Sequence, residues 1–276
     1  MTTRTQSHSL EYTLDALPHL ALNNHRGDID VHHDAAPGEV RITLTSNQPV
    51  DFDLVESRVD GARVTVTIPH LPAEGTSGLS FNLGALSFAL GGGVRVDVDV
   101  HCPPDTVLSV ATKHGDIDIQ GRSGRTAAKT GAGDIVAESC DDASMSTGAG
   151  DIRVLRIGSA TLNTGAGDVS VEAASGRLEI RTGTGDVHVA SSRGHLSIVS
   201  GAGDVHAVVA EGSVEARTGM GDVTIQVPGT VPVWQDLTTG MGEVRSNLPS
   251  HGEPEPGEPF VKVAARSGAG DVNLTV

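Results

Sequence analysis

The middle of the chain alternates apolar and polar residues with a period of two, which predicts β-strands. In one unit, the sequence "VSVEA" puts Val169 and Val171 on one face, and "RLEIRTG" does the same with Leu178 and Ile180. Apolar and β-branched residues bounded by Gly and Ser are typical of strands. No helical stripe of useful length interrupts this pattern. We therefore expect an all-β fold in which each unit contributes two short strands.

A short motif, Thr/Ser-Gly-x-Gly-Asp-Val/Ile, separates these units at steps of 17 or 18 residues. One unit has a single apolar face, so several units must stack to bury a continuous core. The pattern predicts a single-stack, β-helix-like β-solenoid with two short strands per coil, about ten coils and roughly 50 Å of stack, capped at both ends. The acidic residues of the regular copies are Asp116, Asp134, Asp151, Asp168, Asp186, Asp204 and Asp222, with looser copies at Asp28, Glu243 and Asp271.

The regularity of the motif divides the chain into three parts of one continuous domain. Residues 1–110 form an N-terminal β segment and cap with an apolar insert at 74–93, and residues 111–227 form the regular coils. Residues 228–276 form degenerate coils and a cap, with an acidic, Pro-rich loop at 248–260. All six aromatic residues lie in the flanks, where we expect them to close the thin core: Tyr12, Phe52, Phe81, Phe88, Trp234 and Phe260.

Net charge, apolar runs and cysteine count restrict the kinds of partner and the cellular location that we expect. The formal net charge of −16 argues against nucleic acid, whose affinity for proteins comes largely from Lys and Arg. It also argues against electrostatic docking on anionic lipid. The sequence contains no run of 18 apolar residues, so it predicts no membrane span. Its first residues lack the apolar region of a secretory signal. With only two cysteines, we expect a cytoplasmic protein, or one held at the inner membrane face by a partner.

The Gly-Asp repeats, the segment "VWQDLTTGMGEVRSNLP", the acidic loop and the terminal "ARSGAGDVNLTV" carry a family resemblance. Together they resemble the bacterial "putative adhesin", or toastrack, family of β-strand-repeat proteins, a domain-of-unknown-function family. The resemblance covers nearly the whole chain. It implies a β-solenoid-like fold and a link to bacterial envelope-stress systems. It supplies no catalytic residues.

The repeated corner allows a structural and a metal-binding interpretation. In the structural one, each Asp accepts backbone N–H groups of its own corner, and the glycines one and three residues earlier supply positive-φ conformations. The Thr or Ser four residues earlier bonds the corner or the next coil, and Lys129, Arg181, Arg217 and Arg266 offset the stacked charge. In the other, the carboxylates bind Ca²⁺. The G-x-G-D spacing differs from that of calcium nonapeptide repeats. The weak calcium candidates are Asp134, Asp151, Asp168, Asp186, Asp204 and Asp222.

Other candidate residues give weaker signals. His188 and His206 occupy the same position one coil apart, where they could hold a transition metal, but their column is mostly polar outer surface. Neither Cys102 nor Cys140 has a base that the sequence can specify. The tripeptide "RGD" at 26–28 coincides with the first Gly-Asp corner, which accounts for it without adhesion.

The insert "LSFNLGALSFAL" predicts a hairpin with one apolar face. It either folds as a flap over the end of the solenoid or forms a docking patch for a protein or membrane. The residues of this candidate interaction surface are Leu79, Phe81, Leu83, Leu86, Phe88 and Leu90.

These observations favour a non-enzymatic scaffold or protein-interaction module whose partner is another protein or a second copy of the chain, with no cofactor. One alternative is a carbohydrate-active β-helix enzyme, since that fold hosts lyases and hydrolases. Against it, the repeat region has no aromatic residue to form a sugar platform. The other alternative is a calcium-stabilised repeat module.

Overall fold

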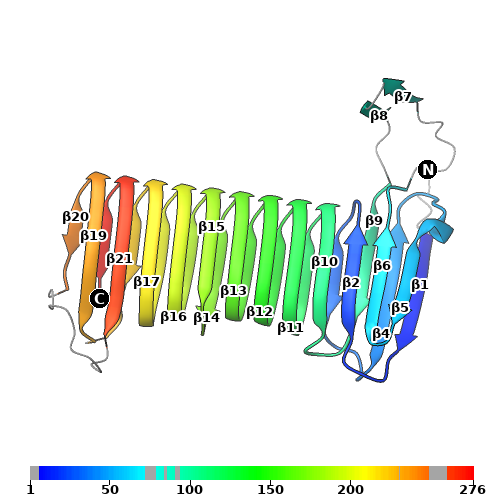
Figure 1. Ribbon diagram of the computed structural model, residues 1–276, viewed down its shortest axis with the longest axis horizontal. Coiled ribbons are helices and arrows are strands. Elements are labelled where there is room, and N and C mark those ends of the chain that lie inside the picture. The colour runs from blue at the N-terminus through cyan, green and yellow to red at the C-terminus, as the bar shows by residue number, and fades with distance from the viewer. Residues whose placement is uncertain (1–5, 72–78, 84–85, 91–93, 230, 249–259) are drawn as a thin grey trace. The chain divides into compact units, whose positions relative to one another are not determined.

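The computed structural model describes residues 6–71, 79–83, 86–90, 94–229, 231–248 and 260–276, with only the backbone given for 79–83 and 86–90. Strands dominate this part of the chain, and its one helical segment is the short 3₁₀ turn η1 (Phe52–Leu54) (Figure 1). The all-β, solenoid fold predicted from the sequence is thereby confirmed. The chain divides into two compact units, residues 1–124 and 125–276, with the division inside β11 (Ile117–Ala132). The three-part division expected from the sequence stays a prediction.

The C-terminal unit is a stack of parallel coils in register. Residues one repeat apart lie opposite each other, as Ile135 and Ile152 do, and Leu178 and Leu196. Identical positions therefore form columns, which Figure 1 shows as strands side by side. The strands of the regular coils are β12 (Ile135–Ala149), β13 (Ile152–Ala166), β14 (Val169–Ala174), β15 (Leu178–Thr184), β16 (Val187–Ala202), β17 (Val205–Met220) and β18 (Val223–Gln226).

Most regular coils form one bent strand of 15 or 16 residues that runs from one Gly-Asp corner to the next. Hydrogen bonding continues through the turn that lies between the two predicted strands. Between β13 and β16, the equivalent stretch is divided into β14 and β15. The bend appears in the burial pattern of β12. Its buried side chains run at steps of two, then of three on either side of Cys140, then of two again up to Thr147. The three-residue steps mark where the backbone turns while one set of side chains stays inside.

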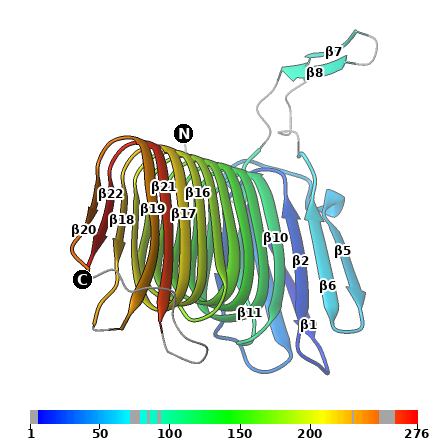
Figure 2. The ribbon, with the colours of Figure 1, turned by 60° about the vertical axis from the view of Figure 1, so that its left-hand side comes forward.

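The last coil in the sequence is not the last coil in space. β21 (Val261–Ala269) pairs with β17 on one side and with β19 (Val233–Met241) on the other. Likewise β22 (Val272–Thr275) lies between β18 and β20 (Val244–Ser246) (Figure 2). The chain thus skips one position, forms the outermost coil, and returns to fill the gap. The inserted terminal coil has strand partners on both sides, whereas chain ends that lack such partners tend to fray.

The N-terminal unit uses the same insertion. The coil formed by β2 (His19–Asn24) and β3 (Ile29–His32) lies between two coils that come later in the sequence. On one side are β10 (Val107–His114) and the start of β11, and on the other are β6 (Arg63–Ile68) and β9 (Val96–His101). Antiparallel strands then extend the pairing: β5 (Glu56–Asp60) pairs with β6, β4 (Glu39–Ser46) pairs with β9, and β1 (Gln6–Thr13) pairs with the other side of β4.

The aromatic residues do not all act as lids. Phe52 is buried and stacks on His8, with 5.6 Å between ring centroids, as expected of a residue that closes the core. Trp234 instead lies opposite exposed Lys262, whose ammonium group is 4.5 Å from the ring centroid. Its register places it on the outer face, where a cation–π contact holds it.

The glycine directly before each Asp is required by both conformation and space. Gly167 has a φ of +142°, and a Cβ there would lie 2.1 Å from the carbonyl oxygen of Gly150 in the preceding coil. The glycine three residues before the Asp is different. Gly165 does not have the positive φ that the sequence analysis assumed, but a Cβ there would lie 2.4 Å from the oxygen of Gly148. This position excludes side chains because neighbouring backbones approach closely.

We predict that Gly167→Ala destabilises the C-terminal unit by at least about 3 kcal/mol, since it adds a backbone clash to a strained φ. The matched control is Gly229→Ala, where φ is +105° but no atom lies within 4 Å of the added Cβ. The control carries the conformational cost alone, roughly 1 kcal/mol. Urea unfolding of both variants measures the difference, and equal losses would show that close stacking is not the constraint.

Candidate functional site

The repeated aspartates form a ladder of hydrogen bonds between coils. The backbone N–H of Asp168 donates to Oδ1 of Asp151 at 2.8 Å, and the N–H of Asp186 donates to Oδ1 of Asp168 at 2.7 Å. The same bond recurs from Asp151 to Asp134, Asp204 to Asp186, Asp222 to Asp204, Asp271 to Asp222, and Glu243 to Asp271. The expected bond within each Asp's own corner is corrected: the carboxylate ties its corner to the next one.

The Thr or Ser four residues before the acidic residue strengthens the same corner. Thr164 Oγ1 donates to the carbonyl oxygen of Gly150 at 2.9 Å, and Thr218 Oγ1 donates to that of Gly203 at 3.1 Å. These hydroxyls are almost fully buried. Ser200 departs from the pattern, because its buried hydroxyl has no hydrogen-bond partner among the described residues.

Three of the cations expected to offset the ladder charge contact other carboxylates. Arg181 lies 3.5 Å from Glu179, Arg217 pairs with Glu215, and Arg266 lies 3.0 Å from Asp236. A ladder contact comes instead from Arg245, whose guanidinium bridges Glu243 and Asp271 at the outermost coil. Within the regular coils, backbone N–H donors contribute to the compensation for the stacked carboxylates.

The calcium interpretation gains no geometric support in the described part of the chain. No group of three or more His, Cys, Asp or Glu residues there is arranged to hold a metal ion. One oxygen of each ladder carboxylate already accepts a backbone N–H. Calcium binding by these aspartates stays an untested prediction.

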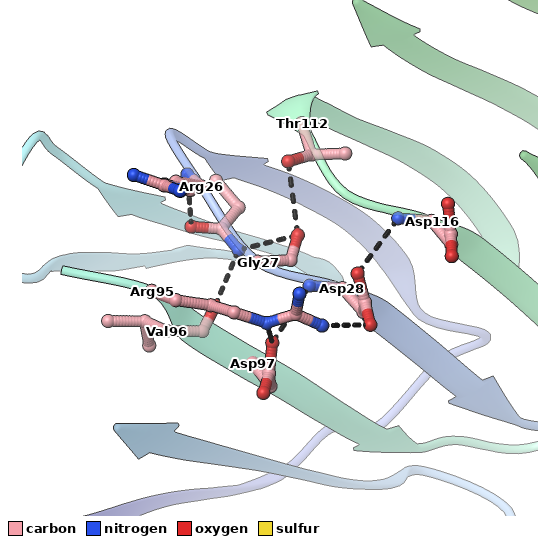
Figure 3. Close-up of polar contacts among 9 residues, drawn as sticks. Arg26, Gly27, Asp28, Arg95, Val96, Asp97, Thr112 and Asp116 are labelled. Carbon is pink, nitrogen blue, oxygen red and sulfur yellow. Dashed lines mark hydrogen bonds and ion pairs between the residues drawn. The ribbon is translucent and has the colours of Figure 1, made fainter. Parts of the chain in front are cut away.

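The "RGD" corner belongs to a ladder in the N-terminal unit. Oδ1 of Asp28 accepts the backbone N–H of Asp116 at 2.9 Å, and Oδ2 contacts Arg95 (Figure 3). The N–H of Asp28 in turn donates to Oδ1 of Asp97 at 3.0 Å. Both carboxylate oxygens of Asp28 are engaged, which assigns this tripeptide a structural role. Asp97 is a ladder residue that sequence reasoning missed, because it lacks the preceding glycine.

Cys102 does have a neighbouring imidazole, which sequence reasoning also missed. Its sulfur lies 3.4 Å from Nδ1 of His33. Nδ1 is also 2.9 Å from the carbonyl oxygen of Pro103, an acceptor that requires the proton on this nitrogen, so the imidazole cannot act as a base through it. Burial raises the pKa of Cys102 to about 12, far from the depressed values of reactive thiols. These features favour a packing role for Cys102 and His33.

Cys140 has a similar environment. It is buried in β12, and burial raises its pKa to about 11. Both cysteines are free thiols.

His188 and His206 stack as the sequence predicts. They lie opposite each other in β16 and β17, with centroids 5.2 Å apart and planes inclined by 4°. A shallow depression of about 410 Å³ beside them is also lined by Asp186, Asp204 and Asp222. Burial, then the neighbouring His188, lowers the pKa of His206, which favours the neutral imidazole. The neutral state avoids repulsion between the two stacked rings, and metal binding by this pair stays an untested prediction.

The predicted interaction insert can be assessed only in its backbone. β7 (Leu79–Leu83) pairs antiparallel with β8 (Leu86–Leu90), and Phe81 lies opposite Phe88. The side chains of this surface lie outside the described residues, so its docking role stays a prediction. The described part of the chain contains no helix long and apolar enough to cross a membrane.

An open strand edge emerges where the sequence indicated only a degenerate coil. No described strand pairs with the outer side of β19 or β20. Val244 is 46% exposed there, whereas Val272 and Val223 at the same position of the inner coils are fully buried. Met241 lies at the outward corner position of the same coil and is 72% exposed, as is usual for this position. The apolar interior of the stack is therefore incompletely covered at this edge.

The chain belongs to a family of β-repeat proteins. The family model described as Toastrack DUF4097 matches residues 17–275, nearly the whole sequence, which confirms the resemblance seen in the repeats. No curated protein matches the chain significantly.

Solved structures share the fold at low sequence identity. One is described as a "putative adhesin" from Parabacteroides distasonis, with 11% identity, a TM-score of 0.52 and 97% of each chain covered. Another is described as a "Putative lipid binding protein" from the same organism, with 13% identity, a TM-score of 0.50 and 96% of each chain covered. Identities this low establish a common fold alone.

The ladder predicts opposite outcomes for two substitutions of one residue. Asp168→Ala should destabilise the C-terminal unit by about 1–2 kcal/mol, because the N–H of Asp186 loses its acceptor. Asp168→Asn keeps an acceptor and removes a like charge, so its stability should equal or exceed that of the parent. Urea unfolding measures both, with exposed Glu172→Ala in the same coil as control. A loss for Asn as large as that for Ala would contradict the hydrogen-bond role.

The parent chain and Asp168→Asn also test whether the Asp ladder binds Ca²⁺. A ligand that binds only the folded state raises the melting temperature. We expect the melting temperature of the parent chain to be the same in EDTA and in millimolar Ca²⁺. A rise that disappears in Asp168→Asn would instead establish the metal-binding interpretation.

Acid should weaken the N-terminal unit through His33. Burial lowers the pKa of His33, outweighing the opposing Pro103 hydrogen bond, so below about pH 6.5 the unfolded chain binds more protons than the folded one. Stability is then complete above that pH and falls as the pH drops toward the lower folded-state pKa. Urea midpoints between pH 7.5 and 5 should fall less steeply in His33→Gln, which keeps a donor for Pro103, than in the parent or in exposed His19→Gln. Equal slopes would exclude His33 as the source.

Proposed function

We propose that this chain is a non-enzymatic binding module that associates with a second copy of itself through the open edge of β19 and β20. The observation that carries the proposal is the exposure of Val244 at a position that is fully buried in the neighbouring coils. A strand edge with unpaired backbone groups is a template for another strand. Pairing there would also cover the half-exposed interior of the outermost coil.

Several features support binding over catalysis. The repeated Asp and Thr side chains are engaged in holding coils together. The two cysteines are buried with raised pKa values, and the imidazole beside Cys102 is oriented against base catalysis. The fold shared with proteins described as a "putative adhesin" and a "Putative lipid binding protein" agrees with a binding role. The free thiols fit a reducing, cytoplasmic setting, which we propose together with a link to envelope stress implied by the family resemblance.

Charged side chains at the edge should abolish self-association. We expect the parent chain to form a concentration-dependent dimer in light scattering coupled to size-exclusion chromatography. Met241→Lys combined with Val244→Lys should be monomeric, because the edge would bury unpaired like charges. Met220→Lys is the matched control, since Met220 occupies the same corner position in an inner coil and is 61% exposed.

Two results would overturn the proposal. One is a parent chain that stays monomeric at high concentration, and the other is a dimer that the double variant leaves intact. Thermal unfolding of the double variant alone verifies that the coil still folds.

A further inference from the structure

The tips of the Gly-Asp corners differ along the chain. In the regular coils, the residue two positions before the Asp is often alanine, as at Ala132, Ala149, Ala166 and Ala202. The corners that follow β2 and β10 carry Arg26 and His114 at this position, preceded by His25 and Lys113. Basic side chains thus replace the small residues of the motif in the N-terminal unit.

Strand pairing gathers these basic residues at one place. Because β2 lies between β10 and β6 in parallel register, the tips that follow the three strands are neighbours. The rings of His25 and His70 lie 4.8 Å apart between centroids, and the N–H of Gly27 donates to the carbonyl oxygen of His114 at 2.9 Å. His25 is half-buried, and the other four side chains are exposed. We call this group the basic ridge: His25, Arg26, His70, Lys113 and His114.

The ridge is locally basic although the whole chain carries a net charge of −16. Burial lowers the pKa of His25, and the positive charges of Lys113, His70, His114 and Arg26 lower it further. The charged groups that lower this pKa are all basic. At physiological ionic strength, exposed charges more than about 8 Å apart are largely screened from each other. A partner that contacts the ridge therefore meets mainly the local charge.

Three carboxylates follow the ridge at the same corners, and they belong to the Asp ladder. Asp28 and Asp97 both contact Arg95 (Figure 3). Oδ1 of Asp28 also accepts the N–H of Asp116, and Oδ1 of Asp97 accepts the N–H of Asp28. These bonds hold the carboxylates of Asp28 and Asp97 within the ladder, beside the basic side chains.

The sum of these charges depends on pH. Arg26, Lys113 and Arg95 balance the three carboxylates, so the corner is close to neutral when its histidines are uncharged. Histidine is the side chain whose charge ordinarily changes between pH 5 and 8. Protonation of the three ridge histidines therefore makes the corner positive in mild acid.

The apolar insert joins the chain beside this ridge. Leu71 directly follows His70, and the N–H of Val94 donates to the carbonyl oxygen of Leu71 at 3.1 Å. The insert therefore begins and ends at one point. The register of β7 and β8 places all six of their leucine and phenylalanine residues on one face of the hairpin. Among the described strands, these two pair only with each other.

An apolar face attached beside a basic ridge fits an anionic membrane surface. Exposed apolar patches mark interaction sites, and basic groups near a membrane are attracted to its anionic headgroups. A bilayer offers both features in one surface, because its headgroups lie directly above its acyl chains. We propose that the basic ridge and the apolar insert together dock the chain on an anionic lipid bilayer, more strongly in mild acid. This docking is independent of the self-association edge.

Flotation with lipid vesicles tests the proposal on the full chain. We expect binding to vesicles that contain phosphatidylglycerol, stronger at pH 5.5 than at pH 7.5, and little binding to phosphatidylcholine alone. Lys113→Ala combined with His114→Ala should weaken binding at pH 5.5 by about tenfold, since each basic group near the surface adds attraction. Phe81→Ser combined with Phe88→Ser should weaken it at both pH values, because the insert loses apolar area.

The matched control removes the same types of charge elsewhere. His19→Ala combined with Arg63→Ala changes two exposed residues that lie opposite each other at the far ends of β2 and β6. Acid also reduces the negative charge of the whole chain, so the variants are compared at one pH. The control should bind as the parent does, and thermal unfolding at pH 5.5 verifies that each variant is folded.

Several results would overturn the proposal. They are equal binding to both kinds of vesicle, no binding to anionic vesicles at pH 5.5, and binding that survives either the ridge or the insert variant. A chain that binds poly-glutamate but no vesicle would have an acidic polypeptide as its partner, which also contradicts lipid docking.

Discussion

The close stacking of one backbone corner on the next is the constraint on which the repeat depends. A carbonyl oxygen of the preceding coil occupies the space where the Cβ of Gly167 would lie, only 2.1 Å away. Once no side chain fits, the corner must be stabilised by other groups. The Asp carboxylate accepts the next coil's N–H, and the Thr hydroxyl donates to the preceding coil's carbonyl oxygen. The glycine, aspartate and threonine of the motif are therefore all explained by the close approach of neighbouring coils at this corner.

Much of this fold could be predicted, because the constraint is local and repeated. Alternating residues such as Val169 and Val171 indicate strands, and the regular motif indicates coils that stack in register. The bond between coils could not be distinguished from an Asx turn within one corner, because both place an Asp after a glycine. The strand insertion of β21 was equally hidden, since sequence order carries no record of which neighbour a strand pairs with.

The same limits apply to the candidate sites. The sequence shows His188 and His206 one repeat apart, so their stacking could be anticipated. Asp97 and the His33–Cys102 contact could not, because they join segments about 70 residues apart outside any regular spacing. The basic ridge depends on the position of β2 between β6 and β10, which no periodic signal predicts.

A stack in register also limits where specific recognition can arise. Each outward position of the regular coils continues into a column, so a side chain there meets a similar environment one coil away. The strands that break the repeat escape this restriction. Antiparallel β1 and β4 place Glu11, Arg41 and His101 in one row that has no copy in the next coil, and the turn before β4 adds Asp34. At the other unit's outermost coil, Val244 meets solvent because the stack ends there. An association edge is therefore expected where the repeat stops, because the outermost coil presents an arrangement that the inner coils do not repeat.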